Sequence, residues 1–203
     1  LDEHLARLQG SAQYFGYPVD MADIELTLAR HAEALSSMAA DPNQAQAQTW
    51  RVRLLCSAGG TASVKSAPLD VPAAVKGLRT VALSSTRVNS ADIFLFHKTT
   101  RRQLLDDAFD REAVPAGHHD VILLNERGEV CEGTRNNIFV EIDGTLFTPP
   151  IECGLLPGTL RATLIKRTDS PACVRILLPE DLKVADKIFL GNSLWGLVEV
   201  ELV

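Results

Sequence analysis

The stretch Val130-Cys131-Glu132-Gly133-Thr134-Arg135-Asn136-Asn137 decides how the second half of this 203-residue chain folds. Apolar runs at 120–124 and 136–142 flank it and have the composition of strands. Asn125-Glu126-Arg127-Gly128 and Asp143-Gly144 are turn sequences beside these runs. The pattern therefore predicts a β-meander that carries Glu132 on a strand or on the turn next to it.

Outside this meander, helical and strand patterns are both present, which predicts a mixed α/β (α+β) fold in two domains. The predicted helices cover 1–15, 20–40, 100–113 and 159–166, and the further strands cover 49–56, 61–64, 78–83, 174–178, 187–190 and 196–203. The polar stretch at 84–92 is typical of a linker. It predicts a small N-terminal domain, 1–84, followed by a larger domain, 85–203.

The composition excludes several classes of partner. The net charge is −6 and the pI is near 5.4, so a broad basic face for nucleic acid or for an anionic membrane is not expected. Apolar runs are short, as in 121–124, and fall far below the roughly 20 residues of a membrane helix. These features favour a small-molecule or protein partner.

The four cysteines, at positions 56, 131, 153 and 173, form no CxxC pair and have no histidine at zinc-ligand spacing. We therefore expect no metal site and no disulfide framework, and a reducing cytoplasm is the simplest location. Leu1 stands inside a predicted helix without a signal-like start, so we expect the true N-terminus to be missing.

Three features invite a functional interpretation, although each has an ordinary structural explanation. Lys98 ends the apolar run 93–96 and enters a predicted helix, but most lysines of this kind are simply exposed. Glu132 is equally compatible with a solvated carboxylate. Gly158-Thr159 begins a helix, where free N–H groups and the helix dipole suit a phosphate, although a plain helix cap is commoner. His4 and Arg7 share a helix face and on their own indicate a surface pair.

Taken in order along the chain, these motifs resemble the fold type IV family of pyridoxal phosphate enzymes. The family includes branched-chain aminotransferases, D-amino acid aminotransferases and 4-amino-4-deoxychorismate lyases. The resemblance rests on Leu1–Leu8, His97–Arg102, Asn125–Phe139, Thr148–Pro150, Leu155–Arg161 and Ala185–Leu194. It implies a two-domain fold whose N-terminal strands precede Leu1, and pyridoxal 5'-phosphate as the cofactor.

The resemblance also implies a role for each site residue. Lys98 would bind the cofactor aldehyde covalently and move protons during the reaction, as a lysine of lowered pKa can. Glu132 would face the pyridine nitrogen and keep it protonated. The cofactor phosphate would be bound by a further group of residues. Within this group, an arginine side chain and the N-terminus of a helix are features that suit a dianion. This last group comprises Arg7, Gly158, Thr159, Leu160, Asn192 and Ser193.

Within this family, the chain is most similar to the aminodeoxychorismate lyases, including the lyase domains fused behind an aminodeoxychorismate synthase. The similarity is carried by 97–102, 154–161 and 191–197, where branched-chain aminotransferases tend to have a Gly-Thr-Ala loop. The implied reaction eliminates pyruvate and forms 4-aminobenzoate for folate synthesis. Departures are Leu105, where related lyases often have an aromatic residue, and Leu160, where aminotransferases have a threonine.

Two other functions stay open from the sequence. One is a class IV aminotransferase acting on branched-chain or D-amino acids, and the other is a non-catalytic remnant domain. The presence of both Lys98 and Glu132 argues against the remnant, because a scaffold needs neither. The resemblance further implies a homodimer and a synthase domain that is fused to the chain or associated with it.

Overall fold

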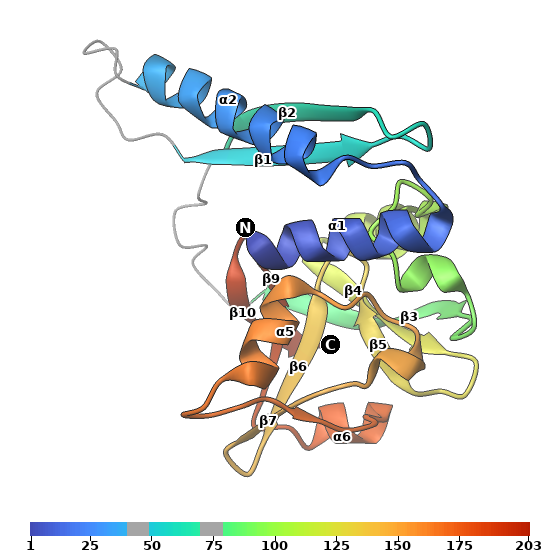
Figure 1. The fold of residues 1–203 in the computed structure, drawn as a ribbon. Coiled ribbons are helices and arrows are strands. Elements are labelled where there is room, and N and C mark those ends of the chain that lie inside the picture. The colour runs from blue at the N-terminus through green and yellow to red at the C-terminus, as the bar shows by residue number, and fades with distance from the viewer. Residues whose placement is uncertain (40–48, 70–78) are drawn as a thin grey trace. The chain divides into compact units, whose positions relative to one another are not determined.

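The computed structural model describes residues 1–39, 49–69 and 79–203, which form two compact units, Leu1–Ala74 and Val75–Val203 (Figure 1). The fold is mixed α/β, as the sequence predicts. The end of the second predicted helix and the start of the strand predicted at 78–83 lie outside the described residues.

The first unit combines two helices with a β-hairpin. The first helix ends at Gly16, which adopts the left-handed conformation (φ 68°) that glycine tolerates best. The second helix begins after Asp20, whose carboxylate accepts hydrogen bonds from the amides of Ala22 and Asp23. The elements are α1 (Asp2–Phe15), α2 (Met21–Ala39), β1 (Trp50–Cys56) and β2 (Ala62–Pro68), and the two strands are antiparallel.

The second unit is built on an eight-stranded sheet in the order β5-β4-β3-β10-β9-β6-β7-β8. An additional pair between β5 and β6 closes the strands from β5 round to β6 into a ring (Figure 1). The strands are β3 (Arg79–Val88), β4 (Asp120–Asn125), β5 (Val130–Gly133), β6 (Asn137–Ile142), β7 (Thr145–Thr148), β8 (Cys173–Val174), β9 (Lys187–Asn192) and β10 (Gly196–Leu202). The meander predicted around Glu132 is therefore confirmed as β4 to β7.

Short helical segments cover this sheet. The α-helices are α3 (Gln103–Ala108), α4 (Val114–Ala116), α5 (Thr159–Lys166) and α6 (Pro179–Lys183), the 3-10 turns are η1 (Ile93–Leu95) and η3 (Ile151–Cys153), and η2 (Phe109–Ala113) is a π-helical turn.

Alternating side chains of the strands divide the core of the second unit into separate clusters. Ile122 and Leu124 of β4 join one cluster with Ile138 and Val140 of β6. Val121 and Leu123 of β4 belong to a second cluster, together with Ala108, Ala113, Cys131, Cys153 and Leu155. The two-residue period of a strand explains this division, since successive side chains point to opposite faces. Because both faces of β4 are covered, all six of its residues are buried.

Three predicted boundaries differ from the structure. The stretch 84–88 is the second half of β3, and the division between the compact units falls earlier, at Ala74/Val75. Ser84 and Thr86 are polar, yet both donate hydrogen bonds to the Glu112 carboxylate, which satisfies them within the sheet. The strand predicted at 174–178 is reduced to the short β8, and the helix predicted at 100–113 begins only at Gln103.

Candidate active site

Glu132 lies in β5 and is almost fully buried, with 6% of its surface exposed. One carboxyl oxygen accepts a hydrogen bond from the side-chain amide of Asn137 at 3.0 Å, and the other accepts one from the backbone N–H of Leu156 at 3.2 Å. The first partner is also the strand neighbour of Glu132, because β5 and β6 pair at these two residues. The carboxyl group is therefore fixed in orientation inside the sheet.

Burial raises the pKa of Glu132 to about 8, because the charged form loses its hydration. The Leu156 amide and the positive charges of Lys98 and Arg102 act in the opposite direction, while Asp120 adds to the increase. A carboxyl group with this pKa holds its proton near neutral pH. A cation close to the carboxyl group would favour its ionised form, and a perturbed pKa of this kind is common among functional groups.

Asn137 connects Glu132 to the start of α5. Its side-chain amide also donates to the carbonyl of Leu156 at 2.9 Å, while its side-chain oxygen lies against Gly158. A Cβ atom at position 158 would overlap that oxygen, so the absence of a side chain there is a steric requirement. Gly158 is the N-cap residue of α5 and provides no side-chain hydrogen bond to the helix start.

The β9–β10 turn lies on the other side of the same helix start. Asn137 of β6 pairs with Gly191 of β9, and a Cβ atom on Gly191 would come within 3.0 Å of the Leu160 side chain. Asn192 accepts hydrogen bonds from the backbone N–H groups of Leu194 and Trp195, which shapes the turn around the exposed Ser193. The structure thus brings together Glu132, Gly158 to Leu160, Asn192 and Ser193.

Lys98 and Arg7, the two predicted basic residues of the site, belong to different compact units. Lys98 is exposed in the segment between η1 and α3, and its positive charge is one of the causes that act to lower the pKa of Glu132. Arg7 lies on α1 of the first unit. Its contribution to phosphate binding stays a prediction.

Sequence reasoning missed several residues that hold this site in place. Asn137 orients Glu132, and Asp120 accepts hydrogen bonds from the turn that joins β5 to β6. Arg102 donates to the carbonyl of Thr134 in that turn at 2.9 Å. The signal available in the sequence was the pair Asn136-Asn137 directly before a buried strand, where amide side chains need partners.

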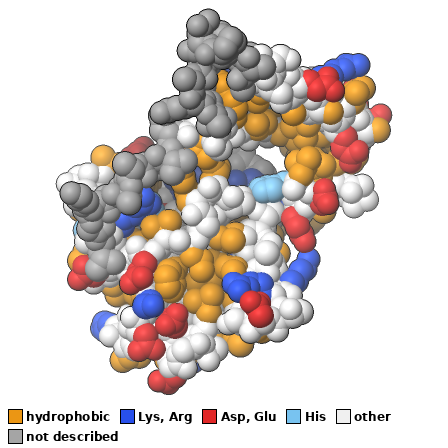
Figure 2. All heavy atoms as spheres, turned by 90° about the vertical axis from the view of Figure 1, so that its left-hand side faces the viewer, with side chains coloured by type: hydrophobic (Ala, Val, Ile, Leu, Met, Phe, Trp, Pro, Cys, Tyr) orange, Lys and Arg blue, Asp and Glu red, His pale blue; other side chains and the backbone are white. Residues whose placement is uncertain are grey.

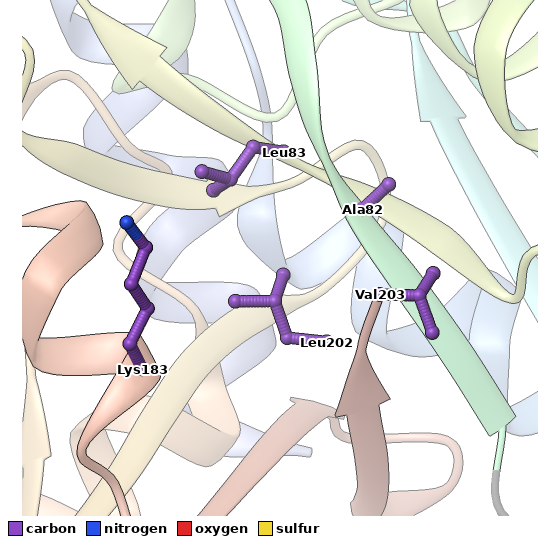
Figure 3. A pocket seen from close by; sticks show the side chains of 5 residues that line it. All are labelled: Ala82, Leu83, Lys183, Leu202 and Val203. Carbon is purple, nitrogen blue, oxygen red and sulfur yellow. The ribbon is translucent and has the colours of Figure 1, made fainter.

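A separate pocket of the second unit lies between β3, the end of β10 and α6 (Figure 3). It is lined by Ala82, Leu83, Lys183, Leu202 and Val203. Lys183 is its one charged lining residue, and none of the predicted site residues lines it. The chemistry of the chain is therefore assigned to the Glu132 site rather than to this pocket.

Comparison with known proteins places this geometry in a family. The family model described as amino-transferase class IV matches residues 1–203. A "Probable branched-chain-amino-acid aminotransferase" of Thermotoga maritima is 31% identical over 201 residues, which is 98% of this chain and 70% of that protein. The chain therefore belongs to the class IV aminotransferase family, and its fold is that of the fold type IV pyridoxal phosphate enzymes.

Solved structures agree with this assignment. A "Putative amino-acid aminotransferase" from Mesorhizobium loti superposes with a TM-score of 0.81 at 41% identity, covering 100% of this chain and 91% of that one. The 4-amino-4-deoxychorismate lyase from Pseudomonas aeruginosa superposes with a TM-score of 0.73 at 25% identity, covering 99% and 76%. Transaminases and lyases are thus both among the structural relatives.

Enzymes of this family use pyridoxal phosphate, and the residues present fit that group. A buried carboxyl group, oriented by Asn137 and Leu156, suits a pyridine nitrogen that must stay protonated. No side chain caps the start of α5 at Gly158, so the first backbone N–H groups of this helix would suit an anion. Lys98 would supply the amine that the cofactor aldehyde requires.

Among the residues that the structure describes, no helix combines the length and the apolar character that crossing a membrane would require.

Proposed function

We propose that the chain is a pyridoxal phosphate-dependent 4-amino-4-deoxychorismate lyase, which releases pyruvate and forms 4-aminobenzoate. The observation that carries this proposal is the Gly191-Asn192-Ser193-Leu194 turn. The Asn192 side-chain oxygen accepts from the backbone N–H groups of Leu194 and Trp195 in this turn, and a Gly-Thr-Ala loop of the aminotransferase type lacks that amide side chain. The turn stands beside Leu160, at the helix start that we assign to the phosphate.

Each residue of the site has a distinct duty in this proposal. When bound, pyridoxal phosphate supplies an aldehyde that captures the substrate amine and a ring that accepts electrons. Lys98 would hold the cofactor through its amine in the resting enzyme and, once free, would act as the base that takes the proton from C4 of the substrate. Glu132 would lie against the pyridine nitrogen and keep it protonated. The phosphate would be held by Ser193 and the backbone amides of Thr159 and Leu160, and the family resemblance adds Arg7 to this group.

The elimination then balances without a second substrate. Removal of the C4 proton leaves an electron pair that expels the enolpyruvyl oxygen from the neighbouring carbon. Enolpyruvate takes up a proton to become pyruvate, and the six-membered ring becomes aromatic. Release of 4-aminobenzoate would leave Lys98 able to hold the cofactor again, and no amino acceptor would be consumed.

A class IV aminotransferase is the second candidate, and the identity to the Thermotoga and Mesorhizobium proteins favours it. The two candidates differ in their need for a keto acid. Purified protein loaded with pyridoxal phosphate is incubated with aminodeoxychorismate alone, and 4-aminobenzoate and pyruvate are measured. We expect equal amounts of both products. Product formation only with branched-chain substrates and a keto acid would replace the lyase by the aminotransferase.

Lys98→Ala is the matched control for both activities. The visible absorption band that appears when pyridoxal phosphate joins a lysine is expected to be absent in this variant, and turnover is expected to fall to background. A wild-type protein that shows no such band would contradict both enzyme functions and favour the remnant domain.

We further propose that the working enzyme is a cytoplasmic homodimer, and that a synthase domain supplies its substrate by fusion or association. Light scattering on the purified chain is expected to give twice the mass of 22.1 kDa. A monomer that is fully active would contradict the dimer.

A further inference from the structure

Asp120 is a buried carboxylate that the proposed chemistry does not use. It begins β4, is 1% exposed, and accepts five hydrogen bonds, four from the β5–β6 turn and one from the next residue of β4. One carboxyl oxygen accepts from the amides of Val121 and Thr134 and from the Thr134 hydroxyl. The other accepts from the amide of Arg135 at 3.4 Å and from the Asn136 side chain at 2.8 Å.

From this carboxylate a chain of amide side chains leads to the β9–β10 turn. Asn136 donates to Asp120, and its own side-chain oxygen accepts from the Asn192 side chain at 2.7 Å. The oxygen of Asn192 accepts in turn from the backbone N–H groups of Leu194 and Trp195. Asp120 is thereby connected to the residues on both sides of Ser193.

Asp120 sets the donor and acceptor direction of each hydrogen bond in the series that runs through Asn136 and Asn192. A carboxylate can only accept, so Asn136 must present its NH₂ group to Asp120 and its oxygen to Asn192. Asn192 must then present its NH₂ group to Asn136, which leaves its oxygen for the turn. An amide at position 120 has only one acceptor oxygen. With this oxygen turned toward Thr134, the amide would offer NH₂ to Asn136, and with it turned toward Asn136, the amide would offer NH₂ to the backbone amides of Val121 and Thr134.

We propose that Asp120 is a positioning residue which, through Asn136 and Asn192, holds the Ser193 turn in the conformation that binds the cofactor phosphate. The inference rests on the proposed function, because it takes the Ser193 turn as part of the phosphate site. It adds a residue on β4 that contacts neither cofactor nor substrate. It also gives a reason for an acidic side chain, Asp120, at a position that is almost completely buried.

The test compares Asp120→Asn with wild type for two ligands, pyridoxal phosphate and pyridoxal, which differ only in the phosphate. We expect the dissociation constant of pyridoxal phosphate to rise about tenfold, since one buried hydrogen bond is lost at the turn. The dissociation constant of pyridoxal is expected to stay within about twofold, because the misplaced groups lie at the phosphate end. Both constants come from absorbance titrations of the ligand-free protein.

A second readout requires no ligand. Backbone amide exchange of Leu194 and Trp195 is expected to accelerate in Asp120→Asn, because the Asn192 oxygen no longer accepts from both. Asp186→Asn is the matched control. It makes the same chemical change at a carboxylate that accepts from the Asp143 amide in the β6–β7 turn. This carboxylate is not part of the hydrogen-bonded relay formed by Asp120, Asn136 and Asn192. This control is expected to leave both readouts at the wild-type level.

Asn136→Ala interrupts the relay in the middle and leaves Asp120 unchanged. It is therefore the alternative test if Asp120→Asn does not fold. It is expected to show the same selective loss for pyridoxal phosphate, and the double variant is expected to lose little more. Equal weakening of both ligands, or unchanged exchange at Leu194 and Trp195, would overturn the positioning role while leaving the proposed function intact. A wild-type protein that binds pyridoxal as tightly as pyridoxal phosphate would overturn the phosphate assignment itself.

Discussion

At the scale of single residues, the protonated Glu132 is the feature with the clearest consequence. Its pKa is raised from 4.5 to about 8 by burial, so the folded protein holds a proton that the unfolded chain has lost. Between these two values the folded state binds more protons, and the free energy of unfolding must fall as the pH rises. Below 4.5 and above 8, Glu132 adds no pH dependence.

The prediction is that Glu132→Gln removes this dependence from the cofactor-free protein. The wild type is expected to lose up to about 1.4 kcal/mol per pH unit over the window from this residue, whereas the variant is expected to lose less. Urea unfolding between pH 5 and about 8.5 measures the difference. Glu201→Gln, at an exposed position of β10, is the control for losing one carboxylate. Identical slopes in wild type and Glu132→Gln would contradict the buried proton.

Asn137 offers a second test at this scale. Its amide donates to both Glu132 and the Leu156 carbonyl, so Asn137→Ala removes two hydrogen bonds in a buried place. We expect a loss of about 1–3 kcal/mol in the free energy of unfolding and weaker binding of pyridoxal phosphate. Denaturant titration and absorbance titration measure the two effects. A variant that keeps wild-type affinity would show that Glu132 is oriented by other contacts.

At the scale of elements, the start of α5 depends on the absence of a side chain. Gly158→Ala would place its Cβ atom against the Asn137 oxygen, so either the helix start or Asn137 must shift. We expect a loss of about 1–3 kcal/mol in the free energy of unfolding, as for other overpacked sites. The affinity for pyridoxal phosphate is expected to fall as well.

Gly10→Ala is the opposite case and the matched control for that experiment. Position 10 lies inside α1, where a Cβ atom would meet no described atom within 4 Å. Alanine favours the helix over glycine, so this variant is expected to gain about 0.5–1 kcal/mol. A destabilised Gly10→Ala, or a Gly158→Ala as stable as wild type, would contradict these packing arguments.

Elements also show where sequence patterns were insufficient. The polar run 84–90 has the composition of a linker, yet its first half extends β3 because Glu112 supplies acceptors for Ser84, Ser85 and Thr86. Glu112 comes from the π-helical turn η2, far along the chain. Such a tertiary partner cannot be read from a local pattern. The helix start at Thr159 needed no partner of this kind and was predicted correctly.

At the scale of the whole molecule, the charge distribution agrees with a small-molecule enzyme. Lys and Arg side chains lie interspersed with Asp and Glu on the face shown in Figure 2, rather than gathered into a basic patch. The net charge of −6 likewise does not favour a polyanionic partner such as nucleic acid.

Cofactor binding should stabilise the whole protein by mass action. A ligand present at 100 times its dissociation constant adds about 2.7 kcal/mol to the free energy of unfolding. We expect pyridoxal phosphate to raise the melting temperature of wild type, and to raise that of Lys98→Ala less because the covalent link is absent. Pyridoxal, which lacks the phosphate, is the matched ligand control. An equal rise for both ligands would show that the phosphate contributes nothing.

The sequence by itself determined the family and the meander around Glu132, because motifs such as 97–102, 125–139 and 155–161 depend on local chemistry and keep their order. Only the tertiary structure decided how the site is held together. Glu132 became a protonated group because β6 and the segment before α5 enclose it, and burial is a property of packing. Asp120 and Asn192 are distant in sequence, and only the order of the strands brings them into one hydrogen-bonded chain through Asn136.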